Sequence, residues 1–202
     1  MGIRNPLRAR WLVVGVVLVA IAGMSAQVWL VRGHPIGQGS VSSSLGLGTT
    51  CRGFTPTATT SRCNEVAFAP GGLVALGFSV RNTGPVPLTI VSVKSLGSDS
   101  PIMLAELDPV LPPAGGPGAV TFAFDRTRPF QSIDLAPGQD APIQFLGRMR
   151  SCDAVRGYWS AGGALRFDTA RVTVRVLAMS TEMEVPLQQA LQIGSPAAGV
   201  CP

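Results

Sequence analysis

The cysteines are the residues whose chemistry this sequence indicates most directly. All four lie beyond residue 50, at Cys51, Cys63, Cys152 and Cys201. An even number of cysteines in an oxidising compartment favours disulfides. We favour the pairing of Cys51 with Cys63, which closes a short loop, and of Cys152 with Cys201, which ties the C-terminus to the domain. A metal site is the alternative, but there is no C-x-x-C spacing and the single histidine, His34, adjoins an apolar N-terminal segment. We therefore predict no metal ligands.

The other reactive side chains form no recognisable catalytic set. A Ser-His-Asp or Cys-His arrangement needs a histidine, and the only one precedes the whole C-terminal part of the chain. Two carboxylate pairs, Glu106 with Asp108 and Glu182 with Glu184, have i, i+2 spacing, which on a strand places both members on one face. Such pairs usually keep a strand face soluble. We predict that the chain is not an enzyme and has no catalytic residues and no cofactor.

The basic residues do not favour a nucleic-acid partner. The formal net charge is +5, but four of the 16 basic residues flank the N-terminal segment, at Arg4, Arg8, Arg10 and Arg32. The other basic residues are nearly balanced by 11 acidic ones, whereas a phosphate-binding surface needs clustered positive charge. A second group of arginines comprises Arg148, Arg150, Arg156, Arg166, Arg171 and Arg175. They could bind an anion if the fold brought them together, but their spacing is typical of strand positions that face solvent.

The N-terminal segment predicts that the chain is located in a membrane. The run Trp11–Val31 contains no charged residue. A helix of this length, rising about 1.5 Å per residue, covers roughly 30 Å, the thickness of a bilayer core. Trp11 and Trp29 lie near its ends, where indole rings favour the membrane interface. We predict a single transmembrane helix over 11–31, in contact with membrane lipid.

The flanking charges predict the orientation of this helix. Arg8 and Arg10 precede the run and Arg32 follows it. An excess of basic residues before a membrane segment favours a cytoplasmic N-terminus. We therefore expect residues 1–10 in the cytoplasm and everything after the helix outside the cell membrane.

A cleaved signal peptide is the alternative for the same segment. Leu12–Ile21 could serve as its apolar core, and Ala20 with Ala22 forms an A-x-A cleavage site. Because apolar residues continue to Val31, we favour an uncleaved anchor. Cleavage would instead release a secreted module that binds a small ligand or a cell-wall polymer.

Beyond the helix, composition separates a linker from a domain. Residues 32–50 are rich in Gly and Ser and lack periodicity, which predicts a flexible tether. Residues 51–202 are sufficient for one domain with a substantial core. Within them, Tyr158 and Trp159 lie in an irregular stretch, where they either cap the core or form a contact surface.

Apolar residues alternate with a period of two along much of 51–202, as in half-buried strands. The strand 74–80, the turn residues 82–85 and the β-branched stretch 88–94 predict a hairpin. The Pro-rich stretch 109–118 is expected to be a loop. Further strands are expected over 120–124, 143–149, 172–176 and 183–193. This pattern predicts an all-β, immunoglobulin-like β-sandwich of about seven to eight strands, preceded by one N-terminal transmembrane helix.

Three segments carry a resemblance to a known group of proteins. The run VALGFSVRNTGPVPLTIVSV resembles the N-x-G-x-x-P-L-x-I hairpin of immunoglobulin-like and fibronectin-type bacterial envelope domains. The later runs PFQSIDLAPGQDAPIQFLGRMRSC and VTVRVLAMSTEMEVPLQQALQI, with the closing Cys-Pro, are similar to membrane-anchored exported proteins of high-GC Gram-positive bacteria. The resemblance covers most of 51–202 and implies a sandwich architecture. It supplies no catalytic or ligand residues.

The sequence therefore favours a non-enzymatic, single-pass membrane protein. We expect its extracytoplasmic immunoglobulin-like domain to bind or scaffold a protein partner at the envelope, for example as an accessory subunit of a membrane complex, and we expect no nucleic-acid partner.

Overall fold

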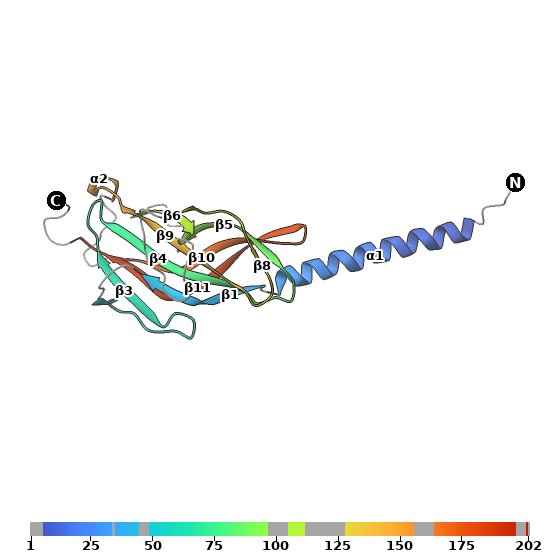
Figure 1. Cartoon of the computed structure of the whole chain (residues 1–202), viewed down its shortest axis with the longest axis horizontal. Helices are drawn as coiled ribbons and strands as arrows, with labels where there is room; N and C mark the ends of the chain where they lie inside the picture. The colour runs from blue at the N-terminus through green and yellow to red at the C-terminus, as the bar shows by residue number, and fades with distance from the viewer. Residues whose placement is uncertain are drawn as a thin grey trace.

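A computed structural model gives the fold of the chain. It describes residues 6–33, 35–44, 49–96, 105–111, 128–155, 164–196 and 201. For residues 6–11, 26–28, 30–32, 41–44, 49–50, 95–96 and 105–108 it describes the backbone alone. The helix α1 (Pro6–Arg32) leads into a β domain, and the C-terminus lies at the end of this domain farthest from α1 (Figure 1).

The described strands form two sheets. The first sheet has five strands in the order β1 (Ile36–Ser44), β4 (Leu73–Asn82), β9 (Asp140–Met149), β6 (Ala105–Leu111) and β7 (Arg128–Pro129). The second has six, in the order β2 (Thr49–Thr50), β3 (Arg62–Ala67), β11 (Met179–Gly194), β10 (Ala164–Val176), β5 (Leu88–Leu96) and β8 (Ile133–Leu135). A single helical turn, α2 (Cys152–Val155), follows β9. The prediction of a mostly β fold with two sheets is confirmed.

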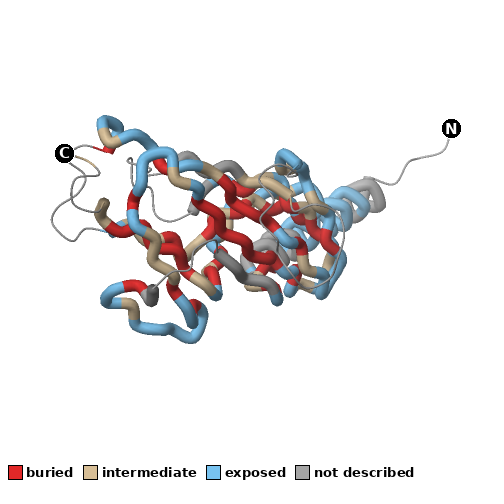
Figure 2. The backbone as a smooth tube through the Cα atoms, turned by 60° about the vertical axis from the view of Figure 1, so that its left-hand side comes forward, coloured by how far each residue is buried: buried red, intermediate tan, exposed pale blue. Residues whose placement is uncertain are grey.

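The core lies between the two sheets, where Figure 2 shows the buried backbone. Phe78 of β4 and Phe145 of β9 stack in the first sheet, with ring centroids 5.9 Å apart and planes 11° from parallel. They belong to one buried cluster with Ile90 of β5 and Val172 of β10 in the second sheet. Burying an apolar side chain of this size stabilises the fold by about 1.5–3 kcal/mol. The alternation of apolar residues thus specifies the inner faces of both sheets.

The strand β4 is buried on both faces at its centre, although alternation predicts exposure of its second face. Ala75 and Ser79 are both buried. Ala75 pairs with Leu146 of β9, and a small side chain beside a larger neighbour is easily shielded from water. This strand is therefore buried on both faces, whereas the alternation predicts a half-buried one.

The predicted tether is wrong in part. Ile36–Ser44 forms β1, which pairs antiparallel with β4 in a register that places Ile36 opposite Asn82. Strand pairing uses backbone groups, so a segment of small residues can complete a sheet edge without an apolar alternation of its own. The strands β2, β3, β6, β7 and β8 were not predicted either. Of these, β2, β7 and β8 have only two or three residues, too few to show an alternation.

The predicted hairpin between residues 74–80 and 88–94 is also wrong. β4 pairs with β1 and β9 in the first sheet, whereas β5 pairs with β10 and β8 in the second. The connection after Asn82 therefore crosses from one sheet to the other. Two consecutive half-buried strands can bury their apolar faces against each other across a core as well as side by side, and alternation does not distinguish these arrangements.

The Pro-rich stretch 109–118 begins inside a strand, which corrects the loop predicted there. Pro109 and Val110 pair with Phe145 and Gln144 of β9. On its other side β6 pairs with β7 only through Val110 and Leu111, so a proline without an amide hydrogen is tolerated. The rest of that stretch, the predicted strand 120–124, His34, Tyr158 and Trp159 lie outside the described residues.

Both disulfides join the predicted partners. Cys51 is bonded to Cys63, and Cys152 of α2 is bonded to Cys201 near the C-terminus. Cys51 and Cys63 are buried with Ala190 of β11 in a small second cluster. The first bond therefore fixes the loop after β2 to the second sheet, and the second bond fixes the C-terminus to the end of β9.

The helix α1 carries exposed apolar side chains. They include Leu12, Val13, Val16, Leu18, Val19, Ile21, Met24 and Trp29. As far as the structure describes them, the helices include none whose length and apolar character meet the requirement for crossing a membrane.

Candidate functional site

Three connections gather at the end of the sandwich that α1 enters, which we call the α1 end. They are residues 83–87 between β4 and β5, residues 136–139 between β8 and β9, and the tip of the β10–β11 hairpin at 177–178. Strand registers place the last two beside the start of β5, because Leu88 pairs with Leu135 and Thr89 pairs with Arg175. Figure 1 shows this end beside the last turn of α1.

Asn82 holds two of these connections together. Its side chain is fully buried. The Nδ2 amide donates to the carbonyl oxygens of Val86 at 2.9 Å and Leu135 at 3.0 Å, and Oδ1 accepts from the amide of Gly84 at 2.9 Å. Its backbone N–H donates to the carbonyl of Gln139 at 2.9 Å. A buried amide with all these bonds made fixes the geometry of both turns.

The chain leaving α1 is attached to the same turns. The carbonyl of Pro35 accepts hydrogen bonds from the amides of Thr83 at 2.9 Å and Gly84 at 3.3 Å. Gly138 donates to the carbonyl of Asn82 at 2.8 Å and has φ +78°, a conformation that favours glycine. The chain is thus hydrogen-bonded to the sandwich at Pro35, three residues after the end of α1.

A surface groove of about 890 Å³ lies at the α1 end. Its walls are residues 87–89, 134–136 and 139 from the turns and β strands, with Arg175 and Leu177 from the β10–β11 hairpin. Thr89 Oγ1 donates to Asp134 Oδ1 at 2.7 Å, which orients the acidic side chain of this wall. The groove therefore offers one oriented carboxylate, one exposed guanidinium and apolar surface.

The hairpin tip combines exposure with an unusual backbone conformation. Val176 pairs with Met179, so Leu177 and Ala178 form a two-residue turn. Leu177 has φ +54° and is 59% exposed. Turns of this length normally place Gly, Asn or Asp at positive φ, because a Cβ is strained there. The sequence places a large apolar side chain where neither burial nor backbone preference favours it.

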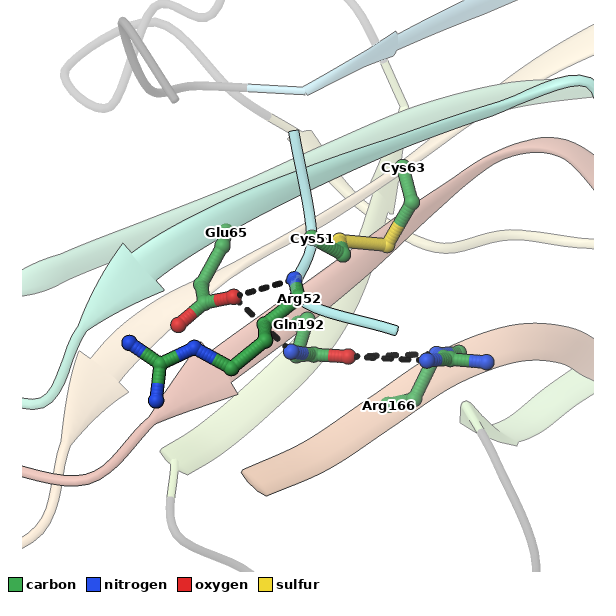
Figure 3. Close-up of a disulfide and its surroundings, with 6 residues drawn as sticks. All are labelled: Cys51, Arg52, Cys63, Glu65, Arg166 and Gln192. Carbon is green, nitrogen blue, oxygen red and sulfur yellow. Dashed lines mark hydrogen bonds between the residues drawn. A yellow bond between two sulfur atoms is a disulfide. The ribbon is translucent and has the colours of Figure 1, made fainter. Parts of the chain in front are cut away.

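A polar cluster lies beside the disulfide Cys51–Cys63, at the β2–β3 edge of the second sheet (Figure 3). Glu65 Oε2 accepts from the backbone amide of Arg52 at 3.0 Å and from Gln192 Nε2 at 2.9 Å. Gln192 Oε1 in turn accepts from Arg166 Nε at 3.2 Å and Nη2 at 3.1 Å. The guanidinium carbon of Arg166 lies 5.4 Å from the ring centroid of Phe54, within cation–π range. These contacts tie the disulfide loop to β3, β10 and β11, so their role is structural.

The carboxylates and arginines noted in the sequence, as far as the structure describes them, mostly have different partners in different parts of the sandwich. Glu182 pairs with Lys94 at 2.7 Å, and Glu184 pairs with Arg171 at 3.5 Å. Both glutamates are exposed, as predicted for a soluble strand face. Arg148 donates to the carbonyl of Gly71 at 3.2 Å, at the opposite end from the groove. The side chains of Arg8, Arg10, Arg32, Glu106 and Asp108 and the whole of Arg156 lie outside the described residues.

Among the residues that the structure describes, no three His, Cys, Asp or Glu side chains gather in a way that could hold a metal ion. The sequence analysis missed the roles of three residues. Gln38 lies in the supposed tether, yet its Nε2 donates to the carbonyls of Thr59 and Pro186, both at 2.7 Å. Asn82 looks like an ordinary turn residue, and Leu177 looks like a core residue. The sequence does carry a signal for Leu177, because Leu-Ala stands between two predicted strands at a place where turn-forming residues such as Gly or Asn are expected.

Comparisons with known proteins do not assign a family. No family model and no curated protein matches this chain. Among solved structures, a family 123 glycoside hydrolase from Clostridium perfringens matches at 9% identity with a TM-score of 0.34. That match covers 65% of this chain but only 22% of the hydrolase chain. The ASH/PapD-like domain 7 of human CEP192 matches at 13% identity with a TM-score of 0.31, covering 76% of this chain and 98% of that domain.

Proposed function

We propose that this chain is a non-enzymatic membrane protein that holds an immunoglobulin-like sandwich outside the cytoplasmic membrane, where the sandwich binds or scaffolds a protein partner. The observation that carries the proposal is the exposed apolar surface of α1. Leu12 is 71% exposed, Val19 is 74% exposed and Trp29 is 73% exposed. A helix whose described apolar side chains are this exposed needs an apolar environment. The sequence of 11–31 suits a bilayer, with arginines at both ends.

The junction between helix and domain supports a scaffolding role. Pro35 is hydrogen-bonded to the turn after β4, and β1 begins at Ile36. A domain attached this closely is held at the membrane surface in a restricted set of orientations, which suits a fixed binding platform.

The use of polar side chains in the sandwich supports a binding role. The outer face of the second sheet carries compensating ion pairs, Lys94 with Glu182 and Arg171 with Glu184. Charges paired on a solvated face contribute solubility and specificity. The two disulfides suit an oxidising compartment outside the cytoplasm.

Membrane extraction tests the anchor directly. Alkaline carbonate should leave the full chain in the membrane pellet, and protease added to intact spheroplasts should digest the C-terminal domain. Val17→Arg, which places a charge in the middle of the apolar helix, should release the chain. Ser132→Arg, an exposed loop position in the domain, is the matched control and should stay in the pellet. Extraction of the unaltered chain, or a domain protected inside the cell with reduced cysteines, would overturn the proposal.

Crosslinking in intact membranes tests the binding role. A scaffolding domain should give a reproducible crosslinked protein that disappears when the β domain is deleted and the helix retained. If no protein is reproducibly attached, the assignment of a protein partner fails.

A secreted module is the second candidate, and one observation favours it. The first described strand of the sandwich begins at Ile36, so cleavage after Ala22 would leave all the described strands intact. The mass of the mature protein separates the two candidates, because cleavage removes the residues up to Ala22.

A further inference from the structure

We propose that the β10–β11 hairpin tip, led by Leu177, is a second membrane contact that inserts into the interfacial layer of the bilayer holding α1. The inference rests on the proposed function, since it requires α1 to lie in a membrane. Its partner is the lipid surface itself, at the boundary between headgroups and acyl chains.

The position of the tip is the first argument. α1 lies next to β10 and β11. In Figure 1 the orange-red β10–β11 hairpin points in the same direction as α1 and reaches the level of the last helical turn. The predicted membrane segment ends at Val31, within that turn. A hairpin that extends beside the end of a membrane helix therefore meets the membrane interface.

The chemistry of the tip is the second argument. Leu177 is a large apolar residue, 59% exposed, at a positive φ of 54°. In water this position favours Gly or Asn for both solubility and backbone conformation. An interfacial layer changes the balance, because transfer of an exposed leucine side chain out of water is favourable. Ala178 adds no polar group beside it.

The surroundings of the tip are the third argument. Arg175 is exposed on β10, two residues before Leu177, and lines the same groove. An arginine beside an apolar anchor can reach lipid phosphates while its neighbour lies deeper. Asp134, on the opposite wall, is engaged by Thr89. The headgroup region thus meets a basic residue beside the apolar tip.

Photo-crosslinking of the full chain in liposomes of phosphatidylglycerol and phosphatidylethanolamine tests the contact. A diazirine amino acid replaces Leu177 in one variant and Leu73 in the control. Leu73 is a second exposed leucine, 44% exposed, at the start of β4 and thus at the opposite end of the sandwich. We expect at least about tenfold more lipid adduct at position 177 than at position 73. Equal yields, with the chain resistant to alkaline extraction, would overturn the inference and leave the anchor standing. Release by alkaline extraction would overturn the anchor and the inference together.

A second pair of variants isolates the leucine side chain. The diazirine amino acid is placed at Ala178, and position 177 is either leucine or, in Leu177→Asn, asparagine. Asparagine tolerates positive φ, so the hairpin is retained, and thermal unfolding checks that the domain still folds. The adduct yield at 178 should fall at least about threefold in the Leu177→Asn chain. An unchanged yield would show that the leucine does not place the tip in lipid.

Discussion

Replacing Asn82 by alanine should be among the most destabilising single substitutions at the α1 end. The side chain is fully buried and makes three hydrogen bonds, two as donor and one as acceptor. The bond to the carbonyl of Leu135 lies in a buried environment, whereas those to Val86 and Gly84 are partly buried.

The size of the stability loss depends on which of the groups bonded to Asn82 can form hydrogen bonds with water after the substitution. A buried acceptor left unpaired costs about 1–3 kcal/mol, and a partly buried one costs less because water replaces the lost bond. Taking about 2 kcal/mol for the carbonyl of Leu135 and somewhat under 1 kcal/mol for each of the other two, we expect Asn82→Ala to lower the free energy of unfolding by about 3–4 kcal/mol.

Guanidinium unfolding of the full chain in a mild detergent, followed by the β signal in circular dichroism, measures this loss. Gln131→Ala removes an amide from an exposed loop position and should change stability by less than about 0.5 kcal/mol. Asn82→Asp keeps the acceptor for Gly84 but loses both donated bonds and buries a charge, so it should cost at least as much as alanine. A loss below about 1 kcal/mol in Asn82→Ala would refute the reasoning, because it would mean that the two turns do not depend on this side chain.

Three further changes test other parts of the fold by the same measurement. Gln38→Ala should cost about 1–2 kcal/mol, since the carbonyls of Thr59 and Pro186 lose their donor; a neutral result would mean that β1 contributes nothing through this link. Replacing both Cys152 and Cys201 by alanine should lower the free energy of unfolding by about 4 kcal/mol, because that bond spans 49 residues. Replacing both Cys51 and Cys63 should lower it by about 3 kcal/mol, because that bond spans only 12. The reverse order would contradict the chain-entropy account. Leu177→Asn should raise stability in detergent by about 0.5 kcal/mol by relieving the left-handed leucine, and a loss would show that Leu177 packs on the domain.

The sequence was most informative where side chains face the core. Alternation identified the strands β9 and β11, because inward positions such as Ile143 and Ile193 are buried as expected. The disulfide partners followed from the short loop that Cys51 and Cys63 close and from the place of Cys201 near the C-terminus. These features depend on residue type along a single segment, which is what a sequence pattern records.

Features that depend on backbone pairing between distant segments were not predictable in the same way. β1 consists of the stretch IGQGSVSSS, whose residues favour a linker. It nevertheless pairs with the edge of β4 and so joins the sheet. β4 and β5 lie in different sheets, and Asn82 bonds the connection between them to the end of β8. At the α1 end the sequence named the turn residues, but it could not show that their hydrogen bonds converge on one buried amide.

The short junction after α1 leads to a last prediction, which separates rigid attachment from simple anchoring. Pro35 is bonded to the turn at Thr83 and Gly84, so the direction in which the hairpin tip points is set by the fold close to the end of the helix. Inserting a flexible (Gly-Ser) segment of about ten residues directly after Gly33 lengthens the junction by a root-mean-square distance of roughly 15–20 Å. The insertion leaves every described hydrogen bond of the sandwich in place, so the free energy of unfolding should be unchanged. Membrane retention should also be unchanged, whereas the lipid adduct at position 177 should fall severalfold, because a tip on a loose tether spends less time at the interface. If the adduct persists at full yield, the tip binds lipid strongly enough by itself and the junction does not orient the domain.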